Sequence, residues 1–167
     1  MHFDVIVVGA GVTGSSLSLN LSKGGLNVGL LDYKNPYGVS KSDIFNGRTA
    51  ALNSTSWNFF KEIGILSTQA KSTMFNNIEV WDSRGSSRIS FSAEEINEKN
   101  LGAVVSNNTL MFDLKTPILS SDKIEFIEGE LEEIKHNEDV VKVSLKDGKN
   151  FTANLLVGSD GANSSVR

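Results

Sequence analysis

The chain has 167 residues, with ordinary hydrophobic and charged fractions of 39% and 22% and a net charge of −4, which favours a globular domain and argues against nucleic acid as the main partner. It contains no cysteine and only two histidines, so disulfides and thiolate metal sites are excluded, and we expect neither a metal site nor a histidine-based catalytic group. Any redox chemistry would therefore depend on a bound cofactor.

The N-terminal segment predicts a βαβ unit. Residues 3–8 (FDVIVV) predict a buried strand, and residues 12–24 predict a helix with Leu17 and Leu21 on one face. Residues 27–32 (NVGLLD) predict a second strand, parallel to the first.

Three glycines join the first strand to the helix in the pattern G-x-G-x-x-G. Gly9 permits the tight turn, Gly11 leaves room for a pyrophosphate, and Gly14 lets helix and strand pack closely. The N-terminus of the helix would add amide donors and a positive dipole. A chance glycine-rich turn is the alternative, but the flanking strands favour a dinucleotide site.

Asp32 lies 18 positions after Gly14, at the expected end of the second strand. This spacing is typical of the acid that accepts hydrogen bonds from an adenosine ribose. A carboxylate there repels the 2′-phosphate of NADP, which leaves FAD or NAD. The alternative is an exposed aspartate at a strand end.

The next stretch predicts a loop over residues 33–48 and a helix from Thr49 to Ile63, ended by Gly64. Arg48 precedes this helix and could contact a pyrophosphate or the edge of a flavin. A solvated surface arginine is the alternative.

The remaining sequence favours strands over helices. The further elements that the pattern predicts are a hairpin at 77–83 and 87–92, a strand at 102–106, a helix at 108–119, a strand at 123–129, and short strands at 130–136, 139–145 and 150–153. A buried apolar run, NLLVGSDG, follows at 154–161. A plain nicotinamide-binding domain would alternate strand and helix without these interruptions.

The last ten residues, GSDGANSSVR, place Asp160 and Gly161 directly after that run, with Ser164 and Arg167 beyond. An aspartate at such a strand end can accept hydrogen bonds from ribityl or ribose hydroxyls. A simple turn before a helix start is the alternative.

Three blocks together, residues 5–32, 47–56 and 155–167, carry a family resemblance. The chain resembles the N-terminal part of the FAD-dependent aromatic hydroxylases related to p-hydroxybenzoate hydroxylase, in particular the ubiquinone-biosynthesis branch. The last block matches the family pattern D-G-x-x-S-x-x-R.

The resemblance implies an α/β fold: a Rossmann-like, doubly wound FAD-binding domain with a β-meander and part of a second, antiparallel substrate-domain sheet. We expect the FAD-binding domain to comprise residues 1–70 and 107–167, and the partial substrate-domain excursion residues 71–106. The family continues to a second Gly-Asp motif that this chain does not reach before Arg167, so we expect a fragment or truncated product that is inactive alone.

The resemblance also implies which residues contact FAD. They are Gly9, Gly11, Gly14, Asp32, Arg48, Asn107, Asp160 and Gly161. The glycines of the first motif would hold the pyrophosphate, Asp32 the ribose and Asn107 the flavin side, although the family often has arginine where this chain has Asn108. Asp160 matches a residue associated with both FAD and the nicotinamide reductant.

The activity implied is hydroxylation of an aromatic ring through a flavin C4a-hydroperoxide, with O2 and NAD(P)H or another electron donor. The expected substrate is a prenylated phenol of ubiquinone biosynthesis, and no side chain is expected to act as an essential acid or base. The alternatives are a flavin oxidoreductase of the geranylgeranyl reductase or amine oxidase type, and a non-catalytic dinucleotide-binding fragment.

No run of ~18 apolar residues predicts a transmembrane helix, and no signal-peptide pattern precedes the first strand. We expect a cytoplasmic protein. Because the implied substrate carries a polyprenyl chain, we also expect peripheral association with the inner face of the membrane or with a biosynthetic complex.

Overall fold

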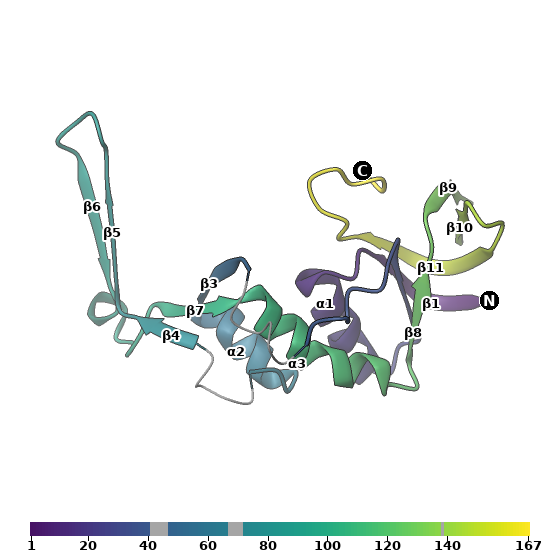
Figure 1. Ribbon diagram of the computed structural model, residues 1–167, viewed down its shortest axis with the longest axis horizontal. Coiled ribbons are helices and arrows are strands. Elements are labelled where there is room, and N and C mark those ends of the chain that lie inside the picture. Colours follow the sequence, from purple (N-terminus) through teal and green to yellow (C-terminus); the bar gives the residue numbers. More distant parts are fainter. Residues whose placement is uncertain (41–46, 67–71, 138) are drawn as a thin grey trace. The chain divides into compact units, whose positions relative to one another are not determined.

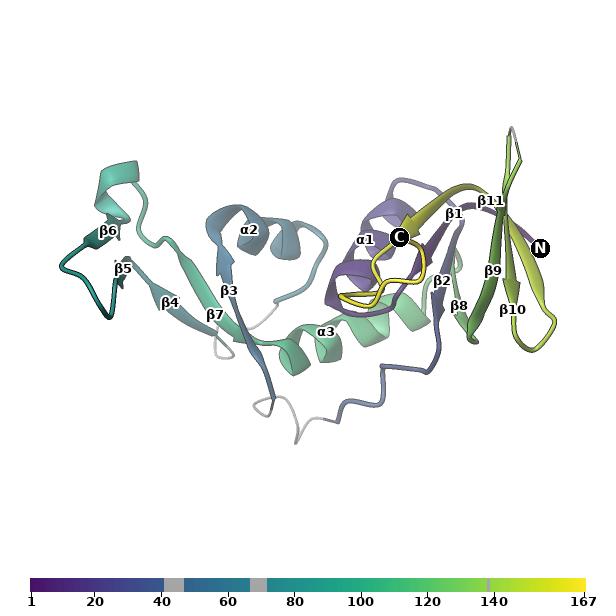
Figure 2. The same ribbon diagram turned by 90° about the horizontal axis from the view of Figure 1, so that it is seen from above.

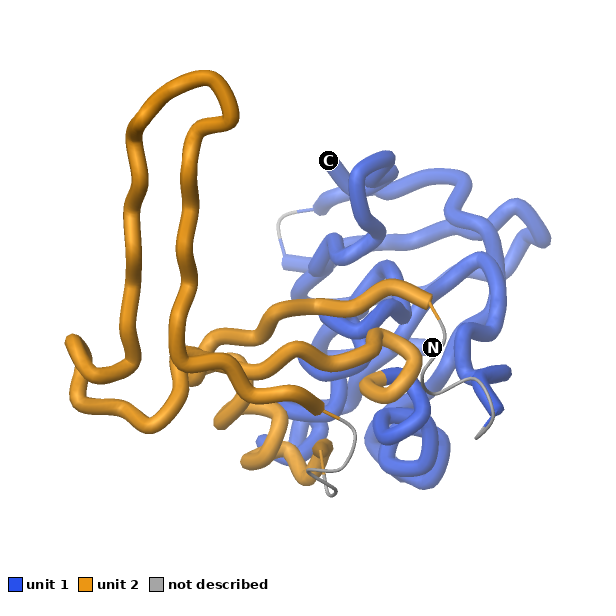
Figure 3. The backbone as a smooth tube through the Cα atoms, turned by 60° about the vertical axis from the view of Figure 1, so that its left-hand side comes forward, with its two compact units in different colours: residues 1–41, 111–167 blue, residues 42–110 orange. Residues whose placement is uncertain are grey.

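The computed structural model describes residues 1–40, 47–66, 72–137 and 139–167. The chain divides into two compact units (Figure 3), a first unit of Met1–Lys41 with Met111–Arg167 and a second unit of Ser42–Leu110. The expected boundary between residues 70 and 71 lies outside the described residues, as does part of the expected loop 33–48. The division into an FAD-binding domain and a substrate-domain excursion therefore stays a prediction.

The first unit is built on a six-stranded sheet (Figure 1). In spatial order its strands are β8 (Ile124–Glu128), β2 (Val28–Asp32), β1 (His2–Val8), β11 (Asn150–Gly158), β10 (Val141–Leu145) and β9 (Leu131–His136). The first four strands run parallel, and β11, β10 and β9 form an antiparallel meander. The expected α/β class, with a parallel sheet and a meander, is confirmed.

Helix α1 (Val12–Lys23) lies against β1, β2 and β8 in Figure 2. Its buried face consists of Gly14, Ser15, Ser16, Ser18 and Leu19. Leu17 and Leu21, four positions apart on this helix, are half-buried, so the fully buried face consists mainly of small residues. Small side chains on this face let the helix approach the sheet closely.

Strands of the parallel part and of the meander share one hydrophobic core. Its buried members are Phe3, Ile6, Val8, Leu31, Ile127, Val141, Val143, Leu145 and Ala153. This core fixes the carboxyl ends of β1 and β2, from which the turns described below emerge. In the described part of the chain, no helix combines the length and apolar character needed to cross a bilayer.

The second unit contains a three-stranded antiparallel sheet and a separate hairpin that extends away from it (Figure 3). The sheet strands, in order, are β3 (Thr49–Asn53), β7 (Gly102–Ser106) and β4 (Ser72–Phe75), and the hairpin strands are β5 (Asn77–Trp81) and β6 (Arg88–Ser92). Its helical segments are α2 (Ser54–Glu62), the short 3-10 helix η3 (Glu94–Ile96) and the start of α3 (Asn107–Leu119), which continues into the first unit.

The expected helix start at Thr49 is wrong. Residues Thr49–Asn53 form a strand because each of them pairs with a residue of β7. Helix α2 begins only after Asn53, whose side-chain oxygen accepts a hydrogen bond of 2.8 Å from the backbone N–H of Ser56. Strand β4 was not expected from the sequence.

One strand, β11, covers the segment expected at 150–153 and continues through the next one as far as Gly158. It pairs with β10 on one edge and with β1 on the other. The expectation that its second half is buried is also wrong, since Leu155 is 55% exposed.

Candidate dinucleotide-binding site

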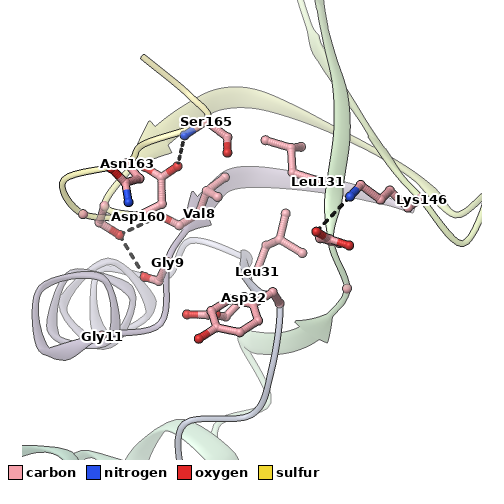
Figure 4. Close-up of a pocket in the computed structure, with 15 residues that line it drawn as sticks. Val8, Gly9, Gly11, Leu31, Asp32, Leu131, Lys146, Asp160, Asn163 and Ser165 are labelled. Carbon is pink, nitrogen blue, oxygen red and sulfur yellow. Dashed lines mark hydrogen bonds and ion pairs between the residues drawn. The ribbon is translucent and has the colours of Figure 1, made fainter.

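A cavity of about 600 Å³ opens in the first unit, at the carboxyl ends of the parallel strands (Figure 4). Its lining residues are Val8, Gly9, Gly11, Leu31, Asp32, Tyr33, Gly129, Glu130, Leu131, Lys146, Ser159, Asp160, Gly161, Asn163 and Ser165. In open α/β sheets, ligands bind in the crevice at this edge. The topology thus brings together residues that are more than a hundred positions apart in the chain.

Gly9 and Gly14 are required by the backbone itself. Gly9 has φ +99°, and a Cβ there would lie 2.5 Å from the carbonyl oxygen of Ser159. A Cβ on Gly14 would overlap the carbonyl oxygen of Gly9. These two glycines therefore shape the turn and allow the helix to pack over it.

Gly11 is different, because neither its conformation nor its packing requires glycine. Its φ of −67° and ψ of −175° suit any residue, and no atom of the described residues lies within 4 Å of the position of an added Cβ. It caps α1 without a side-chain hydrogen bond and lines the cavity. The open space before helix N–H groups fits the phosphates of a dinucleotide.

Asp32 ends β2 and lines the cavity, as the spacing predicts. Its Oδ2 accepts a hydrogen bond of 2.7 Å from the backbone N–H of Ala10, which lies between Gly9 and Gly11. A carboxylate offers about four acceptor sites. Capacity therefore remains for ribose hydroxyls beside a carboxylate that the protein already holds in place.

Asp160 lines the cavity and also holds the turn that follows β11. Its carboxylate accepts hydrogen bonds of 2.6 Å from the Ser164 hydroxyl, 2.6 Å from the Ser165 N–H and 3.3 Å from the Val166 N–H. Burial opposes ionisation, but these hydrogen bonds outweigh it and lower the pKa of Asp160. Next to it, Gly161 has φ +82°, which favours glycine.

Sequence reasoning missed Ser159, which fastens β11 to the glycine turn. Its hydroxyl lies 2.9 Å from the carbonyl oxygen of Val8 and 2.8 Å from that of Gly9, while its N–H donates to Val8 over 2.7 Å. Ser159 could have been found in the sequence because it directly precedes Asp160, a residue that was already a candidate.

An ion pair at the rim of the cavity was also missed. The ammonium group of Lys146 lies 2.8 Å from Oε1 of Glu130, and both side chains are largely exposed (Figure 4). Nothing in the sequence pattern indicates this pair, because its members lie on different turns of the meander.

Arg48 and Asn107 belong to the second unit, where the structure places them side by side. The N–H of Asn107 donates a hydrogen bond of 2.8 Å to the carbonyl oxygen of Arg48, next to the paired residues Thr49 and Ser106. The side chain of Arg48 is exposed. A role for either residue at a cofactor stays a prediction.

Comparison with known proteins finds ubiquinone-biosynthesis hydroxylases among the curated relatives. The chain is 27% identical to the 3-demethoxyubiquinol 3-hydroxylase of Escherichia coli (strain K12), over 98% of this chain and 42% of that protein. It is 26% identical to the mitochondrial ubiquinone biosynthesis monooxygenase COQ6 of Drosophila melanogaster, over 99% of this chain and 37% of that protein. The chain therefore spans less than half the length of these relatives.

Solved structures share the fold. One of them is pqsL of Pseudomonas aeruginosa, which is described as a probable FAD-dependent monooxygenase. It superposes with a TM-score of 0.78 at 18% sequence identity, and the match covers 100% of this chain and 44% of the pqsL chain. The p-nitrophenol 4-monooxygenase PnpA of Pseudomonas putida DLL-E4 superposes with a TM-score of 0.74 at 22% sequence identity. The match covers 98% of this chain and 42% of the PnpA chain. A family model described as an FAD binding domain matches residues 2–167. With the glycine turn and Asp32 at the mouth of the cavity, this match shows that the chain belongs to the FAD binding domain family.

Proposed function

We propose that the chain is the FAD-binding part of a flavin-dependent monooxygenase that hydroxylates an aromatic ring, with a prenylated phenol of ubiquinone biosynthesis as substrate. The observation that carries the proposal is the open space before Gly11, beside an Asp32 carboxylate that is already oriented by Ala10. The ubiquinone hydroxylases among the curated relatives supply the substrate class.

In this proposal, each group of residues binds a different part of FAD. The turn of Gly9, Gly11 and Gly14 and the first N–H groups of α1 bind the pyrophosphate, and Asp32 binds the adenosine ribose. We further propose that Asp160 and Gly161 bind hydroxyls of the ribityl chain, and that Arg48 and Asn107 also contact the cofactor.

FAD, once reduced by NAD(P)H or another electron donor, supplies the activation of O2 that ring hydroxylation needs. The chain's own side chains bind and orient the cofactor and keep water from its phosphates; none of them acts as an essential acid or base. A polyprenyl substrate resides in the lipid phase, so we also propose peripheral association with a membrane surface or a biosynthetic complex.

Cofactor titration tests the proposal first. The purified chain is titrated with FAD and the quenching of flavin fluorescence is followed, with Gly11→Val as the matched negative control. Saturable binding to the wild type and its loss in Gly11→Val support the FAD site, whereas equal binding to both chains contradicts it.

Because we expect the chain alone to be inactive, turnover is tested separately on the full-length gene product, with a prenylated phenol, O2 and NADH or NADPH, by mass spectrometry of the product. A product heavier by one oxygen supports the monooxygenase. Reduction of prenyl double bonds or oxidation of amines would point to another flavin oxidoreductase, and tight FAD binding with no reduction by any donor would point to a non-catalytic binding module. Flotation with vesicles of anionic and neutral lipids tests the membrane association.

A further inference from the structure

Tyr37 lies in the segment that follows β2 and is 2% exposed. Its hydroxyl lies 2.8 Å from Oγ of Ser15 in the first turn of α1, and its ring makes an edge contact with Phe126 at a centroid distance of 5.7 Å. Packing alone would require only the aromatic ring of Tyr37, so the contact of its buried hydroxyl with α1 suggests a further role.

The direction of the hydrogen bonds follows from the protons available. Oγ of Ser15 lies 2.9 Å from the carbonyl oxygen of Ala10, which can only accept. A serine hydroxyl has one proton, so Ser15 donates to Ala10 and Tyr37 must donate to Ser15. The result is a buried chain of two hydrogen bonds that ends on the glycine turn, and such chains strengthen one another.

The Ala10 carbonyl shares a peptide plane with the N–H of Gly11. In a trans peptide these two groups point in opposite directions. Since the carbonyl points toward Ser15, the N–H of Gly11 points away from the Ser15–Tyr37 pair. Gly11 lines the cavity, and the space before it is open.

Both peptide groups that flank Ala10 are therefore held by side chains. Asp32 holds the N–H of Ala10, and Ser15, backed by Tyr37, holds its carbonyl. We propose that Tyr37 and Ser15 are positioning residues that orient the N–H of Gly11 toward the diphosphate of the bound cofactor. This inference rests on the proposed function, because it assumes a diphosphate at Gly11.

The ionisation of Tyr37 is consistent with a donor role. Burial raises the pKa of Tyr37 to about 12, and the nearby Asp32 charge adds to the rise. The hydroxyl therefore keeps its proton at every pH at which a cofactor would bind.

The experiment measures phosphate-specific binding to the whole chain by calorimetry, with ADP and adenosine as probes. The variants are Tyr37→Phe, Ser15→Ala and the double substitution. Ser22→Ala is the matched control, because the Ser22 hydroxyl donates to the Leu19 carbonyl in the same helix at 2.8 Å, away from the cavity. Urea unfolding of each variant measures stability in parallel.

Tyr37→Phe and Ser15→Ala should each lower the affinity for ADP by about three- to tenfold, the range for one hydrogen bond, and change the affinity for adenosine by less than about twofold. The double variant should bind ADP no more weakly than Ser15→Ala, because the two residues act in series. The control should bind both probes as the wild type does.

Equal losses for ADP and adenosine, or an unchanged ADP affinity in Tyr37→Phe, would show that Tyr37 only fills the core. Additive losses in the double variant would show that Tyr37 does not act through Ser15 and would also overturn the proposal. Tyr37→Phe alone carries the test if Ser15→Ala does not fold, since it keeps the ring and its contact with Phe126. A wild type that binds neither FAD nor ADP would instead overturn the proposed function itself.

Discussion

Ala10 and Asp32 are joined by a hydrogen bond of 2.7 Å from the backbone N–H of the first to Oδ2 of the second, across 22 positions of the chain. The bond ties the glycine turn after β1 to the end of β2. It also holds the carboxylate in place before any ligand binds, which reduces the ordering cost of recognition. The glycine motif and the acidic residue are thus structurally coupled.

Replacement of that carboxylate should weaken cofactor binding. Asp32→Ala removes a charge-assisted acceptor and its anchor on the turn, so the dissociation constant of FAD should rise roughly tenfold to a hundredfold. Asp4→Ala is the matched control, because Asp4 accepts a hydrogen bond of 2.7 Å from the N–H of Asn27 but does not line the cavity. Fluorescence titration of both variants measures the difference, and equal FAD affinities would remove Asp32 from the site.

A substitution at Gly11 should affect cofactor binding without lowering the stability of the fold. A Cβ there has no atom of the described residues within 4 Å and suits the backbone. Gly11→Ala should therefore leave the free energy of unfolding unchanged or raise it by about 0.4–1 kcal/mol, while it narrows the phosphate site. Gly14→Ala should instead lose about 1–3 kcal/mol, because its Cβ overlaps the Gly9 carbonyl. Urea unfolding and FAD titration measure the two effects. A strongly destabilised Gly11→Ala would mean that this glycine serves the fold and not a ligand.

The glycine turn and Asp32 could be predicted because their geometry is local to one βαβ unit. Strand, turn, helix and strand follow each other within residues 2–32, and the spacing of the motif reflects the contacts made there. Thr49–Asn53 could not be predicted as a strand, because its partner Gly102–Ser106 lies about fifty positions away.

Tyr37 gave no signal for a different reason. A tyrosine within the sequence NPYG is typical of a surface loop, and no motif links it to Ser15. The buried small face of α1 was missed because serine counts as polar in a pattern search. On the buried face of this helix, the size of a side chain decides its burial more than its polarity, because the helix must approach the glycine turn closely.

A substitution at Arg48 tests whether this residue contacts the cofactor. If its guanidinium contacts the pyrophosphate or the flavin, Arg48→Lys should weaken FAD binding although the charge is kept, because lysine lacks the planar fork of donors. A solvated arginine would tolerate the change within about 0.5 kcal/mol of stability and without loss of flavin. Arg84→Lys, in the exposed turn of the β5–β6 hairpin, is the control. Equal FAD occupancy in both variants would place Arg48 outside the site.

Tyr37 should make the fold sensitive to high pH. Its pKa is raised to about 12 in the folded chain from an ordinary value of 10.0, so its stabilising effect is complete below pH 10 and is lost as the pH rises toward 12. Tyr37→Phe should flatten the stability profile in this window and remove the tyrosinate absorbance that develops near pH 12. Tyr33→Phe, which removes the chain's other tyrosine, should keep both features. An alkaline profile that does not change in Tyr37→Phe would contradict the buried, protonated hydroxyl.

Asp160 should have the opposite pH dependence. Its pKa is lowered below the ordinary 3.8 in the folded chain, because the hydrogen bonds from residues 164–166 outweigh the cost of burial. Its stabilising effect is therefore complete above the ordinary carboxyl pKa and is lost as the pH falls through the lowered one. The measurement is amide hydrogen exchange at Ser165 and Val166 as the pH falls below about 4, corrected for the intrinsic exchange rate.

Protection at these two amides should fall with pH in the wild type and be low at every pH in Asp160→Ala. Ser164→Ala should give an intermediate result, because it removes one of the three hydrogen bonds to the carboxylate. Ser165→Ala should behave as the wild type, since Ser165 donates through its backbone N–H. If protection at Val166 is the same in Asp160→Ala and in the wild type, Asp160 does not hold the turn, and its carboxylate is left entirely to the cavity that it lines.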